Sequence, residues 1–346
     1  HQIKHADHFG LTGVNPSFSF SSVMQRIHQV IAAIAPHDSV ERYQSLGVEV
    51  LQGHAKLISP WCVSITHADG SSTQLTSRSI IIATGAAPFV PPLPGLESIN
   101  YLTSDTLWEH LRSNEQAPKR LVILGGGPIG CELAQAFARL GSQVTQVEML
   151  ERLMVKEDEE VSLFVKHALQ QDGVNVLTGH KAIKCGVSEL KSEDNLGNEV
   201  THDVKWLEVV CGERIQRIEF DEIIVAVGRA PRLSGFGLEE LGIPTNKVVQ
   251  TNDYLETLLP NIYAAGDVAG PYQFTHAAAH QAWYACVNAL FGQFKRFKVD
   301  YRVIPWATFV DPEVARVGLN EQDAAAQGIS YQVTRYGIDD LDRAIC

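Results

Sequence analysis

The sequence predicts an α/β protein of the three-layer, doubly wound kind, in which two Rossmann-like dinucleotide-binding domains share one chain. A glycine-rich loop at Gly125–Gly130 directly follows a short apolar run and precedes a helical pattern, which is the order of a dinucleotide-binding βαβ unit. Two apolar runs of similar plan, residues 80–88 and 223–231, indicate an internal repeat. The length of 346 residues accommodates about two domains of ~150 residues each.

The composition is that of a globular protein and excludes several functional classes. Apolar residues make up 45% and charged residues 20% of the chain, which is normal for a protein with a large core. The net charge of −12 argues against a nucleic-acid partner, because phosphate binding needs Lys and Arg. No apolar run approaches the ~18 residues of a membrane span. Six cysteines without regular spacing favour a reduced, cytoplasmic protein over a disulfide framework.

The two ends of the chain carry no terminating signals. The first residue is His1, and no signal peptide follows it. The last residues, 341–346, stop without a Gly or Pro terminator. We therefore expect this sequence to be an internal piece of a longer protein.

The first third of the chain predicts one helix followed by short strands. Periodicity and turn residues give, in order, a helix at Phe20–Ile34, strands at Val48–Leu51 and Cys62–Ile65, a hairpin turn at Asp69–Gly70, a buried strand at Ser79–Ala83 and a proline-rich linker at Pro88–Pro94. The run at residues 79–83 is continuous rather than alternating, which is typical of a parallel strand buried on both faces.

The middle of the chain has the pattern of one complete nucleotide-binding unit. Its expected elements are a strand at Leu121–Leu124, a helix at Cys131–Leu140, a strand at Gln143–Glu148, a helix at Glu159–Gln170, a strand at Val174–Leu177 and a polar, strand-rich stretch from Ile183 to Phe220. We interpret the acidic run Glu157–Glu160 as a helix-start cluster that suits the helix dipole.

The internal repeat relates two strands that each end at a glycine. Three residue pairs share the offset 228 − 85 = 143, namely Ala83 and Ala226, Gly85 and Gly228, and Pro88 and Pro231. The repeat predicts a second glycine-rich loop, which at this offset would lie before residue 1. The sequence contains no second GxGxxG, so that loop either precedes this chain or never existed.

The last third of the chain predicts a strand that ends in an acid, a long helix and the beginning of a further domain. These elements are expected at Asn261–Asp267, Thr275–Phe291 and Pro305–Gly318. Ligands of open α/β sheets bind at the carboxyl ends of the strands. Asp267 can therefore hold a sugar-like hydroxyl group there, and a plain loop acid is the equal alternative.

The glycine-rich loop is the strongest candidate site. Gly125 permits a tight turn, Gly127 lets the backbone approach a pyrophosphate, and Gly130 lets helix and strand pack closely. The free N–H groups and partial positive charge of the helix N-terminus favour phosphate. A simple tight βα turn and a methyltransferase-like cofactor site are the weaker alternatives.

The choice of dinucleotide depends on Glu148, which lies 148 − 130 = 18 residues after Gly130. A carboxylate at this strand end accepts hydrogen bonds from both hydroxyls of an adenosine ribose and repels a 2′-phosphate. Glu148 therefore favours NAD over NADP, with an ordinary solvated Glu as the alternative. Arg152 lies nearby in sequence and opposes this interpretation if it reaches the same corner.

Other reactive side chains are better explained without a metal or a nucleophile. His1, His5 and His8 share one helical face, but no Cys or carboxylate partner accompanies them, so a solvated face is favoured. His276 and His280 lack the Glu of an HExxH motif. Cys131 would be activated at a helix N-terminus, yet its place within the loop motif favours a small packing residue. We therefore predict no metal site.

Five motifs taken together resemble one family. They are GGGPIGCE at 125–132, VE at 147–148, IIIATGAAP at 80–88, IIVAVGRAP at 223–231 and NIYAAGD at 261–267. In the order in which they occur along the chain, they resemble the pyridine nucleotide-disulfide oxidoreductases, flavoproteins that include dihydrolipoamide dehydrogenase and mercuric reductase. The segment PWATFVDPEVARVGLNEQDA at 305–324 is similar to the start of the C-terminal α+β interface domain of that family.

The resemblance implies four segments and two cofactors, FAD and NAD. The segments are an FAD-binding domain at 1–115, an NAD-binding domain at 116–232, the return of the FAD-binding domain at 233–300 and a truncated dimerisation domain at 301–346. The implied partners are a small-molecule or protein disulfide substrate and, in the full-length protein, a second copy of the chain. Hydride would pass from NADH to FAD and on to a disulfide or a metal ion.

The resemblance also implies which residues bind the cofactors. The positions implied for NAD are Gly125, Gly126, Gly127, Pro128, Ile129, Gly130, Glu132, Glu148 and Gly228. Those implied for FAD are Gly53, Thr84, Gly85, Asp267, Gln273, Phe274, Thr275 and His276. Among these, Asp267 corresponds to a residue on the ribityl chain, and Glu132 to one that lines the nicotinamide site. Gly53 is a weaker match to a glycine near the adenine.

Several features of the family pattern are absent from this sequence. The N-terminal FAD fingerprint, the Cys-x4-Cys pair and the C-terminal His-Glu pair are missing, and Arg232 stands where Asn is usual. We therefore name no catalytic residue and expect this chain alone to be inactive and to retain little or no FAD. The alternatives are a non-catalytic NAD-binding or interaction module and an NADH oxidase-like or ferredoxin-reductase-like flavoenzyme.

Overall fold

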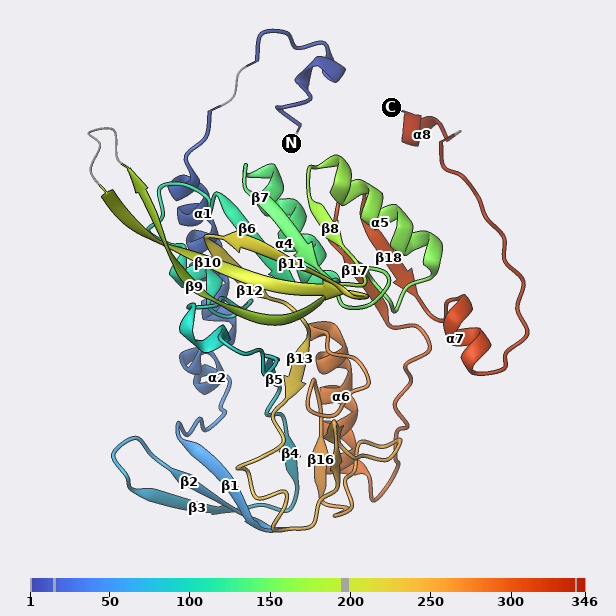
Figure 1. The fold of residues 1–346 in the computed structure, drawn as a ribbon. Helices are drawn as coiled ribbons and strands as arrows, with labels where there is room; N and C mark the ends of the chain where they lie inside the picture. The colour runs from blue at the N-terminus through green and yellow to red at the C-terminus, as the bar shows by residue number, and fades with distance from the viewer. Residues whose placement is uncertain (1, 15–16, 194–198, 340, 346) are drawn as a thin grey trace.

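The computed structural model in Figure 1 describes residues 2–14, 17–193, 199–339 and 341–345. It confirms an α/β protein with parallel sheets. We call the part built around the glycine-rich loop the second unit and the part built around residues 80–88 the first unit. In the view of Figure 1 the second unit, mainly green and yellow, lies above the first.

The second unit has three layers. Its central parallel sheet has the order β12-β6-β7-β8, with strands at β6 (Arg120–Leu124), β7 (Gln143–Val147), β8 (Asn175–Leu177) and β12 (Glu222–Val225). One face carries the helices α4 (Pro128–Arg139) and α5 (Glu159–Gln171). The other face carries an antiparallel sheet of β9 (Lys181–Glu193), β10 (Glu199–Cys211) and β11 (Arg214–Phe220). The buried strands read as continuous apolar runs because both of their faces are covered.

Two hydrophobic clusters hold these layers together. On the antiparallel side, Leu207 and Phe220 pack with Val122 and Val225 of the central sheet. On the helical side, the core also includes Phe20 and Met24 of α1 (Phe20–Ile34) and Leu107 and Leu111 around α3 (Leu107–His110). The ring centroids of Phe20 and Phe137 are 6.5 Å apart. Segments that precede the second unit in sequence therefore contribute to its core.

The first unit is assembled from two distant parts of the chain. The parallel strands β4 (Ile80–Ile82) and β16 (Ile262–Ala264) pair along their length. The helix α6 (Thr275–Phe291) packs against both strands. The remaining strands are β1 (His54–Ser59), β2 (Cys62–Thr66) and β3 (Ser72–Thr76), which form an antiparallel sheet, and the two-residue strands β14 (Thr245–Asn246) and β15 (Val248–Val249).

A short antiparallel ladder joins the two units. It pairs β5 (Ala86–Pro88) with β13 (Arg229–Pro231), with Ala87 opposite Ala230 at its centre. Because 230 − 87 = 143, the two halves of the internal repeat meet each other at this ladder.

The C-terminal segment returns to the second unit. It contains the hairpin of β17 (Pro305–Thr308) and β18 (Val314–Val317), followed by α7 (Glu321–Ala326) and α8 (Asp342–Ile345). Strand β17 contacts α4 of the second unit. The other short elements are the 3-10 helices η1 (Ala6–Phe9), η2 (Ala35–Asp38) and η3 (Leu96–Ser98) and the helix α2 (Val40–Ser45).

Two sequence predictions of secondary structure need correction. No strand forms at Val48–Leu51, because Gly47 ends α2 at a φ of 84° and the N–H of Val48 closes that helix on the carbonyl of Tyr43. Helix α4 begins at Pro128 rather than Cys131, because extended Gly127 serves as N-cap and proline suits the first helical position. The helices predicted at Phe20–Ile34 and Thr275–Phe291 have those bounds. Within the described residues, no helix combines the length and apolarity that crossing a bilayer requires.

Candidate dinucleotide-binding site

The glycine-rich loop forms at the carboxyl end of the central strand β6. Gly125 has a φ of 114°, a conformation that favours glycine. A Cβ at this position would overlap the carbonyl oxygen of Ala226 on the neighbouring strand end. A Cβ at Gly130 would overlap the carbonyl oxygen of Gly125. These two glycines therefore allow the close approach of strand, loop and helix that the sequence pattern predicts.

Gly127 differs from its neighbours because it faces open space. Its backbone is extended, and no atom lies within 4 Å of the place where a Cβ would be. It is also the N-cap of α4, a 12-residue helix whose first turn leaves backbone N–H groups without helical partners. The result is an open cradle, lined by amides at the positive end of a helix dipole. This geometry fits a diphosphate group.

Glu148 lies directly beside this cradle. One of its carboxylate oxygens accepts the N–H of Gly126 at 2.6 Å, and the other accepts the N–H of Leu150 at 2.7 Å. These bonds fix the orientation of the carboxylate and leave its remaining lone pairs for other donors. The structure therefore brings Glu148 and the glycine corner together, as the ribose hypothesis requires.

Arg152 does not oppose Glu148, because its guanidinium is occupied elsewhere. It donates to the carbonyls of Glu157 at 2.7 Å and Val155 at 3.1 Å. A third bond, of 2.8 Å, goes to the side-chain oxygen of Gln322 in the C-terminal segment. The sequence raised Arg152 against the preference for NAD over NADP, and in the structure its guanidinium bonds to these three groups instead of to Glu148.

Cys131 is a packing residue. Its side chain is buried and contacts the carbonyl of Gly126 and the amide of Gln146. Burial raises the pKa of the thiol to about 12, so the thiolate does not form at neutral pH.

Glu132 connects the loop region to the C-terminal segment. Its half-buried carboxylate accepts the N–H of Phe309 at 2.9 Å. Burial raises the pKa of this carboxyl group above its usual value. Sequence reasoning missed Phe309, because the two residues are 177 positions apart and only the docking of the hairpin brings them together.

A second group of predicted residues gathers where strands β4 and β16 end. The hydroxyl of Thr84 donates to the carbonyl of Arg232 at 3.0 Å, and Gly85 has a φ of 65°. Asp267 follows β16, and one of its oxygens lies 3.8 Å from Nε of Arg229. Arg229 also reaches Asp105 at 3.3 Å. A guanidinium from the second unit thus forms an ion pair with an acid of the first unit.

The predicted segment Gln273–His276 opens α6, with Phe274 as its N-cap residue. The ring of Phe274 stacks on His276 at 5.4 Å and on Trp306 at 5.8 Å between centroids. His276 is also 2.6 Å from the carbonyl oxygen of Pro305. The start of α6 is therefore tied to the C-terminal hairpin.

Two residues that the sequence singled out lie outside these groups. Gly53 precedes β1, and a Cβ there would lie 2.6 Å from the carbonyl oxygen of Thr66. This close approach of β1 and β2 is a sufficient reason for a glycine. Gly228 follows β12 with a φ of 129°, near the carboxyl end of the central sheet.

The acidic run Glu157–Glu160 has a larger role than the predicted one. Glu159 and Glu160 occupy the first turn of α5, as the dipole argument predicts. Glu157, however, is only 5% exposed and accepts the indole N–H of Trp306 at 2.9 Å. It also lies 3.4 Å from the guanidinium of Arg316. The run therefore starts the helix as predicted, and Glu157 in addition binds the C-terminal segment.

The histidines that the sequence suggested as possible metal ligands lie near the start of the chain. No group of three or more metal-ligating side chains occurs in the part of the chain that the structure describes. His5 and His8 lie around the 3-10 helix η1 with ring centroids 5.5 Å apart, and His1 lies outside the described residues.

Comparisons with known proteins give matches over most of the chain. A sequence model described as pyridine nucleotide-disulphide oxidoreductase matches residues 7–282, and one for the dimerisation domain of that family matches residues 304–346. A mercuric reductase from Staphylococcus aureus is 34% identical over 339 residues, covering 96% of this chain and 58% of that protein. A dihydrolipoyl dehydrogenase from Bacillus subtilis is 33% identical over 331 residues, covering 93% and 66%.

Solved structures give the same fold. A Cu(II) complex of a mutant of the HOCl-induced flavoprotein disulfide reductase RclA from Escherichia coli has a TM-score of 0.77 at 25% identity, covering 95% of this chain and 70% of that chain. LpdA from Mycobacterium tuberculosis has a TM-score of 0.77 at 24% identity, with coverages of 95% and 68%. The chain spans 51% to 59% of the length of three similar mercuric reductases.

Proposed function

This chain belongs to the pyridine nucleotide-disulphide oxidoreductase family, and we propose that it is the NADH-binding portion of a flavoprotein that reduces a disulfide or a metal ion. Members of the family use FAD and NAD(P)H. The observation that carries the proposal for this chain is the open cradle at Gly127 with Glu148 beside it.

The residues of the second unit would divide the work of binding. The amides at the start of α4 hold the diphosphate, and the carboxylate of Glu148 receives the ribose hydroxyls. Glu148 also repels a 2′-phosphate, which favours NADH over NADPH. Glu132 and Gly228 flank the same edge and would orient the nicotinamide end of the dinucleotide.

The residues of the first unit fit a flavin less completely. Asp267, Thr84 and Gly85 lie at the carboxyl ends of β4 and β16, where a carboxylate can hold the hydroxyls of a polyol chain. The 346 residues contain only one GxGxxG, however, and it belongs to the second unit. When bound, FAD supplies the hydride-accepting group that the side chains themselves lack. We assign Gln273–His276 and, less directly, Gly53 to the same proposed site.

The domain limits follow from this assignment. We propose that residues 1–115 and 233–300 form the FAD-binding domain and that residues 116–232 form the NAD-binding domain. Residues 301–346 would begin a dimerisation domain that pairs two copies of the chain. Among the described cysteines, Cys62, Cys131, Cys185, Cys211 and Cys286 are free thiols. Free thiols suit the reducing cytoplasm, where we place the protein.

The decisive experiment measures NADH binding, not turnover. Gly127→Val adds a side chain where a Cβ would have no neighbour within 4 Å, so the fold is expected to persist while NADH binding weakens at least about tenfold. Ala136→Val is the matched control, because it adds bulk to an exposed position of the same helix. Isothermal titration of both variants and the wild type with NADH provides the measurement. Unchanged affinity in Gly127→Val rejects the proposed site.

A second candidate function is a non-catalytic nucleotide-binding module. The observation in its favour is that no two of the six cysteines have the Cys-x4-Cys spacing. The gene sequence upstream of the codon for His1 separates the candidates. A second GxGxxG followed by Cys-x4-Cys supports the disulfide or metal-ion reductase. A different cysteine arrangement there supports an NADH oxidase-like flavoenzyme, and a start codon close to His1 supports the module.

A further inference from the structure

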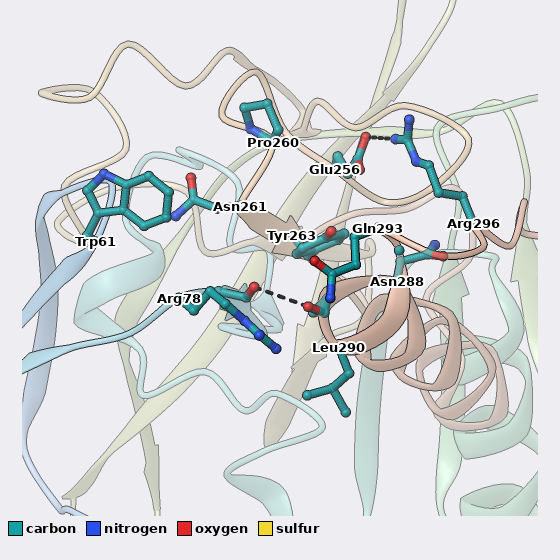
Figure 2. Close-up of a pocket in the computed structure, with 13 residues that line it drawn as sticks. Trp61, Arg78, Glu256, Pro260, Asn261, Tyr263, Asn288, Leu290, Gln293 and Arg296 are labelled. Carbon is teal, nitrogen blue, oxygen red and sulfur yellow. Dashed lines mark hydrogen bonds and ion pairs between the residues drawn. The ribbon is translucent and has the colours of Figure 1, made fainter.

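A pocket of about 600 Å³ lies in the first unit, away from the proposed nucleotide edge (Figure 2). Its lining includes Ser79 and Asn261, which directly precede β4 and β16. It also includes Leu290 and Gly292 at the end of α6. The residues proposed to bind cofactors lie where the same strands end. The pocket is therefore a separate feature at the opposite end of this sheet.

Three polar side chains in the pocket have no partner among the residues that the structure describes. They are the guanidinium of Arg78, the hydroxyl of Tyr263 and the amide of Gln293. Tyr263 is the most informative of them, because the residue is only 5% exposed and yet its hydroxyl reaches the surface of the pocket. The hydroxyl is therefore free to donate a hydrogen bond to a molecule in the pocket, while burial of the ring holds it in place.

The charge of the pocket favours an anion. Glu256 also lines it, but its carboxylate already pairs with Arg296 and accepts the side-chain amide of Asn252 at 2.8 Å. Arg78 therefore adds one uncompensated positive charge in a chain whose net charge is −12. A guanidinium matches the geometry of a carboxylate or a phosphate group.

The remaining wall of the pocket favours a flat molecule. Trp61 lines the pocket with a side chain that is 54% exposed, and Figure 2 shows its ring at one end of the cavity. An indole face of this kind binds planar groups by stacking. Pro260 continues this less polar part of the wall.

We propose that this pocket binds a small organic anion with a planar body. Arg78 pairs with its carboxylate or phosphate group, and Tyr263 and Gln293 donate hydrogen bonds to it. The planar body lies against Trp61. This site would act independently of the nucleotide cradle, and nothing in the proposed function requires it.

Benzoate is the probe that tests the site, because it combines a carboxylate with a planar ring. We expect saturable binding of benzoate to the full chain by isothermal titration, with quenching of tryptophan fluorescence. Arg78→Gln is expected to weaken binding about tenfold, because it removes a charge-assisted hydrogen bond. Tyr263→Phe keeps the buried ring and is expected to weaken binding about threefold or more.

The controls separate anion recognition from other effects. Arg112→Gln removes an exposed arginine that pairs with Glu109 on the surface, and it should leave benzoate binding unchanged. Benzyl alcohol lacks the charge and inorganic phosphate lacks the ring, so both should bind at least about tenfold more weakly than benzoate.

Arg78 also lies near the end of α6, where a cation offsets the helix dipole. If Arg78→Gln lowers the melting temperature but leaves benzoate affinity unchanged, that structural role is the whole explanation and the proposal is wrong. Absence of saturable benzoate binding to the wild type overturns it as well.

Discussion

The carbonyl oxygens of Gly85 and Gly228 accept hydrogen bonds of the same length from opposite halves of the internal repeat. The N–H of Phe89 donates to Gly228 at 2.9 Å, and the N–H of Arg232 donates to Gly85 at 2.9 Å. Since 228 − 85 and 232 − 89 both equal 143, each bond is the image of the other. The joint between the two units therefore has a local two-fold axis, of the kind that relates identical subunits in a dimer.

Arg229 breaks this symmetry. Its counterpart in the repeat is Ala86, because 229 − 86 = 143, and the guanidinium of Arg229 donates to the carbonyl of that residue at 3.0 Å. From there it reaches Asp105 and Asp267. We expect Arg229→Gln to loosen the joint and to lower the free energy of unfolding by about 1 kcal/mol, because these pairs are partly exposed. Chemical denaturation of the variant and of Arg112→Gln gives the comparison, and equal losses in both would contradict a special role for Arg229.

An added methyl group should lower the stability at one glycine of the loop and leave it unchanged at another. Gly130→Ala places a Cβ against the carbonyl of Gly125, so we expect it to cost about 1–3 kcal/mol of stability. Gly127→Ala adds a methyl group in open space and should leave the melting temperature nearly unchanged. Thermal denaturation followed by circular dichroism measures both. A similar melting temperature for the two variants would mean that the loop does not pack as described.

Glu148→Gln tests the acidic corner without changing its shape. A glutamine can accept a hydrogen bond from Gly126 or Leu150 but not from both, because one of its two terminal atoms is a donor. We expect NADH affinity to fall about tenfold and the preference for NADH over NADPH to shrink. Titration with both nucleotides checks this. If the ratio of the two affinities stays that of the wild type, Glu148 does not select the dinucleotide.

The elevated pKa of Glu132 predicts a pH dependence of stability. Burial raises the folded-state pKa above the usual value of 4.5, so the native state binds the proton more tightly than the unfolded state does. The stabilisation is complete below pH 4.5 and is lost as the pH rises through the folded-state pKa. Glu132→Gln should therefore gain stability relative to the wild type as the pH increases across that window. Melting temperatures measured from pH 4 to pH 7 test the sign, and a relative loss would refute it.

The cysteines should differ sharply in reactivity. Cys131 is buried with a pKa of about 12, whereas Cys211 and Cys286 are exposed. At neutral pH we expect iodoacetamide to modify the two exposed thiols and to leave Cys131 unmodified until the protein unfolds. Peptide mass spectrometry after brief labelling reports each site. Labelling of Cys131 in the folded protein at a rate similar to that of Cys286 would show that the loop opens.

Local signals made most of the second unit predictable. The turn at Gly125, the strand before it and the acid at residue 148 are all encoded within a short stretch. The same local logic failed at Val48–Leu51, where alternation suggested a strand but the backbone is used to close α2. A short apolar run does not specify which carbonyl groups will accept hydrogen bonds from its backbone N–H groups.

Contacts between distant segments could not be predicted in this way. The hydrogen bond between Glu157 and Trp306 joins residues 149 positions apart, and the sequence around neither residue predicts it. The same is true of the anchoring of Arg152 by Gln322. Such pairs depend on how whole segments dock, which a pattern of apolar and polar residues does not specify.

The anchoring of the C-terminal hairpin limits how the protein can be divided. The carboxylate of Asp158 accepts the first backbone N–H groups of α7, from Glu321 and Gln322, while its neighbour Glu157 is covered by the hairpin. A recombinant fragment that stops before β17 would leave Glu157 without its cationic and indole partners. Expression of the second unit by itself should therefore keep residues 305–327 or replace Glu157. Otherwise the fragment is destabilised by a carboxylate that has lost its partners Trp306 and Arg316.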